Sequence, residues 1–207
     1  MSERTYRTYL FPLWIRLWHA LNAVLILTLG ATGLSLHFAD PALPLVGFEL
    51  AVRIHNACGV ALAITYLGFL VANAVSGNAR HFFPCGPGFL SALRAQLGWY
   101  ACGIFRGAPH PHEPTPAAPF NVLQAITYAG VMYALLPVLI ASGLVFLYPE
   151  LAPARLFGFD GLLPIALLHY FAAMALLLFL LTHIYLGTTG KSVGQMFRAM
   201  ISGWHVH

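Results

Sequence analysis

Charged side chains are scarce in this 207-residue chain, and their scarcity excludes an ordinary soluble fold. Asp, Glu, Lys and Arg make up 8% of the residues, whereas 59% are hydrophobic and 14% are aromatic. Soluble domains carry about 25% charged residues, because most of their surface faces water. The apolar composition also excludes an intrinsically disordered chain. The length favours one compact unit, so we expect a single domain over residues 1–207.

Cysteine and the common catalytic motifs are also scarce or missing. The three cysteines, Cys58, Cys85 and Cys102, form no C-x-x-C and no C-x-x-C-H pattern, which argues against covalent c-type haem and against cysteine-rich zinc or iron–sulfur sites. The sequence holds no phosphate-binding loop, no G-x-S-x-G and no pair of carboxylates within an apolar segment. Hydrolysis and phosphoryl transfer therefore lack candidate residues, and we predict no catalytic residue in this chain.

Four long apolar segments are present instead, at residues 14–38, 50–76, 120–148 and 162–188. Each is long enough to cross a bilayer core of about 30 Å as a helix, which takes roughly 20 residues. Proline-rich connections at 40–44 and 149–153 separate the first two and the last two segments. The pattern predicts an all-α integral membrane protein, a bundle of four transmembrane helices.

The connection at residues 77–119 is long and has two recognisable parts. Residues 88–105 are amphipathic and contain Arg94, Trp99 and Tyr100, which predicts a short helix lying in the membrane interface. The tract P-H-P-H-E-P-T-P at 109–116 predicts an extended segment at the surface.

Positive charge predicts the orientation of the spans. The two termini and the 77–119 loop hold most of the basic residues, namely Arg4, Arg7, Arg16, Arg80, Arg94, Arg106, Lys191 and Arg198. The two short connections hold only Arg53 and Arg155. The positive-inside rule then places both termini and the long loop in the cytoplasm. The first segment is long enough to span and is followed by no small-residue cleavage pattern, so we expect no cleaved signal peptide.

Histidine is the polar residue in surplus, with ten copies. Five are expected to be solvated residues of the cytoplasmic loops and tail: His81, His110, His112, His205 and His207. The other five, His19, His37, His55, His169 and His183, lie in or beside spans, where a histidine is costly unless it has a partner or a ligand.

Depth sorts four of the span histidines into two levels. With a rise of about 1.5 Å per residue, His19 and His183 lie about 10 and 12 Å on the cytoplasmic side of the membrane centre. His169 and His55 lie about 9 and 13 Å on the other side. We call His19 and His183 the inner pair, and His55 and His169 the outer pair. Two imidazoles from different helices at one level are typical axial ligands of a low-spin haem.

The spacing between His169 and His183 supports two stacked cofactors. Fourteen residues return a helix to within about 40° of its starting face and rise roughly 21 Å. One helix can therefore supply a ligand to each of two sites across the bilayer. The alternative is that these histidines form hydrogen bonds between helices, which the matched depths of all four disfavour.

His37 is a competing candidate for the outer level. It lies 18 residues after His19, which is five turns and the same helix face. Its depth, about 16 Å from the membrane centre, favours a role at the interface instead.

Two further patterns accompany the histidines. The residue four positions after each ligand candidate is small, and these residues are Ala23, Gly59, Ala173 and Gly187. A flat porphyrin against a helix needs such residues, as close helix packing does. Arg16 and Arg53 precede His19 and His55 and are candidates to bind haem propionates through paired hydrogen bonds; snorkelling to lipid headgroups is the alternative.

Several stretches together resemble a known family. They are W-I-R-L-W-H-A-L-N at 14–22, R-I-H-N-A-C-G at 53–59, G-I-F-R-G-A-P-H-P at 103–111, F-N-V-L-Q-A-I-T-Y at 120–128, L-L-H-Y at 167–170 and T-H-I-Y-L-G at 182–187. Nearly the whole chain resembles the di-haem membrane cytochrome b subunits of thiosulfate reductase, of formate dehydrogenase (its gamma subunit) and of nickel–iron hydrogenase.

The resemblance implies two non-covalent haem b groups, each held by two histidines, in a bacterial cytoplasmic membrane. It implies His19 with His183 on the cytoplasmic side and His55 with His169 on the outer side. Asn121 and Gln124 match an N-x-x-Q motif that lies at the quinone site in formate dehydrogenase gamma subunits. A helix-capping Asn and an interfacial Gln are the alternative for these two residues.

By resemblance, the chain anchors a complex and transfers electrons between the quinone pool and an extracytoplasmic partner. That partner is expected to be an iron–sulfur subunit with a molybdenum-type catalytic subunit, or a multihaem cytochrome c, and no nucleic acid is involved. Two alternatives remain open. One is a stand-alone di-haem cytochrome b that oxidises superoxide or another small donor with quinone, against which we count the loop motif at 103–111. The other is a haem-free transporter or structural membrane protein.

Overall fold

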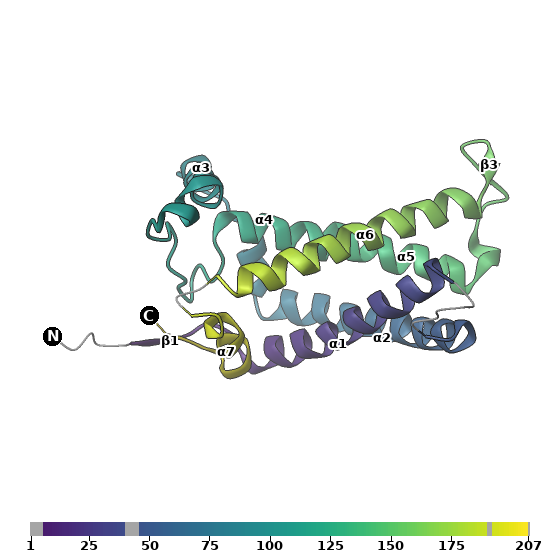
Figure 1. Ribbon diagram of the computed structural model, residues 1–207, viewed down its shortest axis with the longest axis horizontal. Helices are drawn as coiled ribbons and strands as arrows, with labels where there is room; N and C mark the ends of the chain where they lie inside the picture. The colour runs from purple at the N-terminus through teal and green to yellow at the C-terminus, as the bar shows by residue number, and fades with distance from the viewer. Residues whose placement is uncertain (1–5, 40–45, 190–191, 207) are drawn as a thin grey trace. The chain divides into compact units, whose positions relative to one another are not determined.

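The computed structural model describes residues 6–39, 46–189 and 192–206 (Figure 1). Outside the described residues lie Arg4, Lys191, His207 and the proline-rich connection at 40–44. The chain divides into two compact units. The first, which we call the span unit, comprises Trp14–Val71 and Leu135–Tyr185, and the second, the loop unit, comprises residues 1–13, Ala72–Ala134 and Leu186–His207.

Among the described residues, four helices are long and apolar enough to cross a membrane. They are α1 (Leu13–His37), α2 (Phe48–Val75), a composite helix over Val122–Leu147, and α6 (Leu162–Gly187). Their mean hydropathy lies between 1.5 and 2.3. The predicted four-helix membrane architecture is confirmed, and each end falls within two residues of its predicted position.

The third span changes pitch in its middle. It consists of α4 (Val122–Gly130), a π-helical turn η4 (Val131–Leu135) and α5 (Leu136–Leu147). Pro137 explains the change, because proline has no N–H to donate to the carbonyl of residue 133 and its ring crowds that carbonyl. A π turn relieves such a conflict without ending the helix. In α6, by contrast, Pro164 stands in the first turn, where a helix tolerates proline.

The helices of the span unit pack through aromatic and small residues. Trp18 of α1 donates its indole N–H to the carbonyl of Thr65 in α2 at 3.2 Å, and its ring stacks on Phe69 with centres 4.3 Å apart. A Cβ built on Gly30 of α1 would lie 3.1 Å from the Leu177 side chain of α6. The glycine therefore permits a close approach between these two helices.

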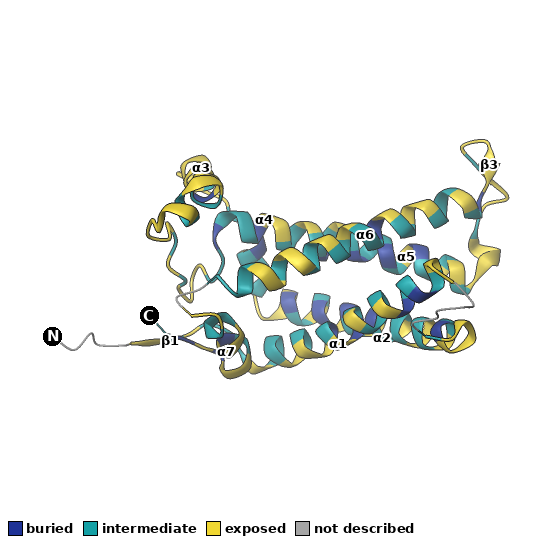
Figure 2. Cartoon of the chain, in the orientation of Figure 1, coloured by how far each residue is buried: buried dark blue, intermediate teal, exposed yellow. Residues whose placement is uncertain are grey.

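Many positions along the spans are exposed (Figure 2), and large hydrophobic side chains are among them. Leu17, Val24, Ile64 and Leu178 are each more than half exposed. Extended apolar surface of this kind marks a membrane contact. These side chains therefore face lipid in the native setting.

A short hairpin joins α5 to α6 after the 3₁₀ turn η5 (Pro149–Leu151). Strands β2 (Arg155–Leu156) and β3 (Phe159–Asp160) pair antiparallel. Phe157 and Gly158 form the turn with φ values of 53° and 84°, the positive values that a two-residue type I′ hairpin turn requires. The Asp160 carboxylate then accepts a hydrogen bond from the backbone N–H of Leu162 at 3.0 Å, which caps the start of α6.

In the loop unit, the described ends of the chain pair with each other. Strand β1 (Arg7–Tyr9) lies antiparallel to β4 (Trp204–Val206), and the rings of Tyr9 and Trp204 are 5.1 Å apart. Helix α7 (Gln195–Ser202) precedes β4 and ends at Gly203, whose φ is 85°. Both ends and the long loop belong to this one unit, as expected if they lie on the same side of a membrane.

The long loop is largely helical before its proline tract. It contains η1 (Asn78–Phe82), α3 (Phe89–Gly98), a π turn η2 (Trp99–Gly103) and a 3₁₀ turn η3 (Ile104–Arg106). The predicted helix at 88–105 is confirmed, although its second half departs from α-helical pitch. Residues 109–116 form no helix, as their prolines predict.

Candidate functional site

The inner pair joins the first span to the fourth. His19 of α1 and His183 of α6 face each other with ring centres 6.2 Å apart. Both side chains are half-buried. Phe179, one turn before His183 on α6, stacks on the His183 ring with centres 5.5 Å apart. The sequence-predicted partners at this level are thus neighbours in the structure.

The outer pair joins the second span to the fourth. His55 of α2 and His169 of α6 have ring centres 6.4 Å apart. Phe146 of α5 meets the His169 ring edge-on at 5.6 Å. Because α6 is one uninterrupted helix, the 14 residues from His169 to His183 separate the two pairs by about 21 Å along its axis.

Both outer histidines have a hydroxyl group at the same ring nitrogen. Thr32 Oγ1 of α1 lies 2.9 Å from His55 Nδ1, and Ser142 Oγ of α5 lies 2.8 Å from His169 Nδ1. Sequence reasoning missed both hydroxyl residues. The signal that would have found them is a repeat, A-T-G-L at 31–34 and A-S-G-L at 141–144.

The spacing of each pair fits one metal ion between two imidazoles. A histidine nitrogen binds a transition metal at about 2.0–2.1 Å. Adding about 1.1 Å from that nitrogen to the centre of its ring places two axial rings about 6.2–6.4 Å apart. The observed separations of 6.2 and 6.4 Å agree with this value.

Orphaned polar atoms near both pairs also fit an additional group. Asn22 Oδ1 and Ser35 Oγ are buried and have no hydrogen-bond partner among the described residues. Asn22 lies one turn after His19, and Ser35 lies one turn after Thr32. A buried polar atom without a partner costs about 1–3 kcal/mol, so a polar group supplied by a ligand would stabilise these positions.

His37 does not face His169, as a ligand at the outer level would. Its ring stacks on Tyr170 with centres 4.7 Å apart, and it also meets Phe38. The residue that faces His169 is His55. The geometry therefore favours His55 over His37 at the outer level.

The small residues that follow the histidines have varied surroundings. A Cβ built on Gly59 would meet no described atom within 4 Å, which leaves open space one turn after His55. At Gly187 the corresponding space is taken by the Phe197 ring of α7, 3.2 Å away. Ala23 and Ala173 are half-buried on α1 and α6.

The two arginine candidates differ in exposure. Arg16 is half-buried on α1, three residues before His19. Arg53 is exposed and pairs with Glu49, one turn earlier on α2, at 3.8 Å. Such an exposed pair contributes little to stability, so it leaves Arg53 available for another anion.

Asn121 and Gln124 form a capping box at the start of α4. The Asn121 side chain accepts from the Gln124 backbone N–H at 2.9 Å, and the Gln124 side chain accepts from the Asn121 backbone N–H at 3.1 Å. Asn121 is buried. The capping role is thus present, and it uses one side-chain oxygen of each residue while the amide N–H groups remain donors for other bonds.

The loop motif at 103–111 folds back onto the helix before it. A Cβ on Gly103 would lie 2.8 Å from Trp99 Cδ1, and the Trp99 indole N–H donates to the carbonyl of Ala108 at 2.9 Å. The His110 ring lies 4.5 Å from that of Trp99. The motif therefore has a structural role within the loop. For this reason it argues less strongly against a stand-alone cytochrome.

One of the loop and tail histidines that were expected to be solvated is buried. His205 in β4 is buried, with 6% of its surface exposed, so that expectation is wrong for it, because the β1–β4 pairing covers the C-terminal segment. His112 is half-buried, and this burial lowers the pKa of its imidazole. A hydrogen bond to the Ala118 backbone raises the pKa, and the neighbouring His110 lowers it, so the net direction is downward.

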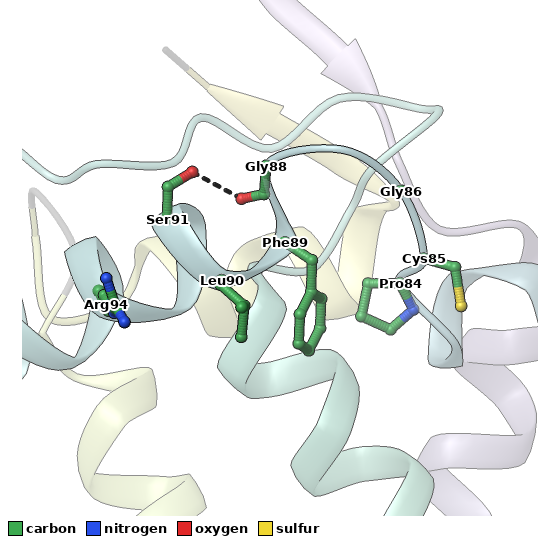
Figure 3. Close-up of a pocket in the computed structure, with 8 residues that line it drawn as sticks. All are labelled: Pro84, Cys85, Gly86, Gly88, Phe89, Leu90, Ser91 and Arg94. Atoms are coloured by element: carbon green, nitrogen blue, oxygen red, sulfur yellow. Dashed lines mark hydrogen bonds between the residues drawn. The ribbon is translucent and has the colours of Figure 1, made fainter.

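A surface hollow lies at the start of α3, between Pro84 and Arg94 (Figure 3). Ser91 Oγ donates there to the carbonyl of Gly88 at 2.7 Å. None of the predicted haem or quinone residues lines this hollow.

Four spans that carry two facing pairs of histidines are the arrangement expected of one class, the membrane cytochromes of b type. Comparison with known proteins agrees. The model of the family described as prokaryotic cytochrome b561 matches residues 10–203. The chain is also 38% identical over 202 residues to the Escherichia coli (strain K12) protein named "Putative cytochrome YdhU", covering 97% of this chain and 76% of that protein.

The chain belongs to the prokaryotic cytochrome b561 family. It is a membrane cytochrome of electron transport, and haem b is the cofactor that the family implies. The haem-free alternative loses its support with this membership.

Proposed function

We propose that the chain is a di-haem electron-transfer subunit with both haem b groups inside one membrane domain over residues 1–207. His19 and His183 hold the inner haem, and His55 and His169 hold the outer haem. The observation that carries the proposal is the pair of ring separations, 6.2 and 6.4 Å, at two levels about 21 Å apart along α6. Each bound haem supplies reversible one-electron transfer between ferric and ferrous iron.

The residues of the chain supply position and surroundings. The four histidines fix the two metal positions through α1, α2 and α6, while Phe146 and Phe179 cover one ring of each pair. Such apolar cover would exclude water from a bound haem and, together with the two histidines, would tune its redox potential. Arg16, Arg53 and the buried Ser35 hydroxyl are the proposed partners of the haem carboxylates.

Quinone is the proposed electron carrier on the cytoplasmic side, and Asn121 is its proposed contact, with Gln124 beside it. The capping box leaves the amide N–H groups of both side chains as potential donors, and a quinone carbonyl needs a donor. The test is Asn121→Asp, which keeps a capping oxygen but removes the amide donor. Quinone turnover should fall while the stability of the fold is retained; unchanged turnover would place the quinone elsewhere.

An extracytoplasmic redox protein is the proposed partner at the outer haem. It is expected to be an iron–sulfur subunit with a catalytic subunit, or a multihaem cytochrome c. Support comes from the absence of catalytic motifs in the sequence and from the charge distribution, which predicts both termini in the cytoplasm. With both haems bound, the outer and the inner histidine pairs would hold them along a path between partner and quinone.

Mild detergent purification of the native complex tests this proposal. A b-type reduced-minus-oxidised spectrum together with companion redox subunits is the expected result. A b-type spectrum with the chain alone, and reduction of quinone by superoxide, would favour the stand-alone cytochrome. The absence of a b-type band would refute the proposal.

A further inference from the structure

Each outer histidine is bound at Nδ1 by a hydroxyl group from the helix beside it. The two bonds are Thr32 Oγ1 to His55 Nδ1 at 2.9 Å and Ser142 Oγ to His169 Nδ1 at 2.8 Å. Thr32 and Ser142 are 2% and 4% exposed. Both hydroxyl groups are therefore shielded from bulk water, and their hydrogen-bond partners are protein atoms.

The direction of these two bonds follows from where the hydroxyl protons go. Thr32 Oγ1 donates to the carbonyl of Thr28 at 2.8 Å, and Ser142 Oγ donates to the carbonyl of Val138 at 2.6 Å. A hydroxyl has one proton to donate, so each oxygen is left to accept from the histidine. Nδ1 of His55 and of His169 then carries the proton, and Nε2 presents a lone pair.

The same arrangement occurs twice on different helices. In both places a glycine follows the hydroxyl residue, and a Cβ built on Gly33 or Gly143 would lie 3.4 Å from Cε1 of the same histidine. The sequences A-T-G-L at 31–34 and A-S-G-L at 141–144 thus place a hydroxyl acceptor and a glycine beside each outer ring. Helix packing alone requires no hydroxyl at these positions.

We propose that Thr32 and Ser142 are positioning residues that hold His55 and His169 as Nδ1–H tautomers and lower the redox potential of the outer haem. An acceptor at Nδ1–H fixes the ring orientation and makes the coordinating nitrogen more basic. A more basic ligand stabilises ferric iron over ferrous iron. The inference rests on the proposed function, because it presupposes a haem between His55 and His169.

The test compares hydroxyl-free and hydroxyl-retaining variants of the intact haem-loaded protein. Thr32→Val and Ser142→Ala remove the hydroxyl acceptor and leave the backbone carbonyls of Leu29 and Leu139 as hydrogen-bond partners of the two histidines, whereas Thr32→Ser and Ser142→Thr keep the hydroxyl. Thr28→Val is the matched control, because Thr28 makes the same bond to a carbonyl one turn back. The readouts are a potentiometric titration of both haems and the electron paramagnetic resonance spectrum of the ferric protein.

Thr32→Val and Ser142→Ala should each decrease the ferric-to-ferrous ratio of the outer haem at fixed potential by about 3- to 10-fold. A tenfold change equals about 59 mV for a one-electron couple. The inner haem should be unaffected, and the hydroxyl-retaining variants and Thr28→Val should titrate like the unmodified protein. Selective loss of the outer haem in Thr32→Val, with retention in Thr32→Ser, also supports the proposal.

Unchanged outer-haem potentials in both Thr32→Val and Ser142→Ala overturn the inference and leave the proposed function intact. An equal shift in Thr28→Val or in Thr32→Ser overturns it as well, because the effect would not depend on the hydroxyl at Nδ1. Failure of the proposed function itself is distinguishable, since His55→Ala would then leave the number of bound haems unchanged.

Discussion

Gly143 offers a graded perturbation of the outer site that leaves all four histidines in place. A Cβ at this position would lie 3.4 Å from His169 Cε1, which is an ordinary contact, so Gly143→Ala should be tolerated. The two methyl groups of valine add bulk beside a ring that already contacts the Cβ position. We therefore expect Gly143→Val to displace the ring.

The expected cost follows from the penalty for overfilling a packed interior, about 1–3 kcal/mol. At about 1.4 kcal/mol per tenfold change, the outer haem should bind about 5- to 150-fold more weakly in Gly143→Val. Gly68→Val is the matched control, because it introduces the same residue in an α-helical span where a Cβ meets no described atom within 4 Å.

The assay is haem retention during dilution, followed by the two b-type signals in a redox titration. Gly143→Val should lose the outer haem selectively, whereas Gly143→Ala and Gly68→Val should keep both haems. Retention of both haems with unchanged affinity in Gly143→Val would refute the reasoning. Equal losses in Gly143→Val and Gly68→Val would attribute the effect to the helix and not to the contact with His169.

Three further predictions concern other parts of the chain. His183→Ala should lose the inner haem and quinone turnover while retaining the outer haem, and His37→Ala should retain both, as counted by haem content. Asn121→Ala should lower the unfolding free energy by about 1 kcal/mol through loss of the cap, measured by thermal unfolding against Asn121→Asp. The lowered pKa of His112 favours its neutral form in the folded loop, so its contribution to stability is present above about pH 6.5 and is lost as the pH falls below that value. The protection factors of the amides in residues 96–118, meaning exchange rates corrected for the intrinsic rate at each pH, should therefore fall at acidic pH, and His112→Gln should weaken that fall.

The four spans and the histidine pairing were accessible from the sequence for physical reasons. Apolar length decides whether a helix crosses a membrane, and a constant rise per residue converts sequence position into depth. His19, His55, His169 and His183 were therefore sorted into the two pairs that face each other in the structure.

Depth alone could not supply the rotational position of each side chain. In the sequence, Thr32 and Ser142 are ordinary residues of apolar spans. The contact of their hydroxyl groups with the His55 and His169 rings depends on how the helices are rotated. Rotation also separates His37 from His55, since His37 packs on Tyr170.

Contacts between distant segments were the other missing part. The pairing of β1 with β4 covers His205, although nothing in its local sequence predicts burial. The return of the 103–111 motif onto Trp99 likewise depends on a turn and on a close approach at Gly103.

The central claim is that this chain holds two haem b groups, each between two histidines. Its most direct test is the ratio of haem to protein in the purified chain, measured by pyridine haemochrome absorbance and quantitative amino-acid analysis, for the unmodified protein and for His19→Ala and His55→Ala. The account predicts two haems per chain in the unmodified protein and one in each variant. A single haem per chain, or variants that both retain two, would contradict it.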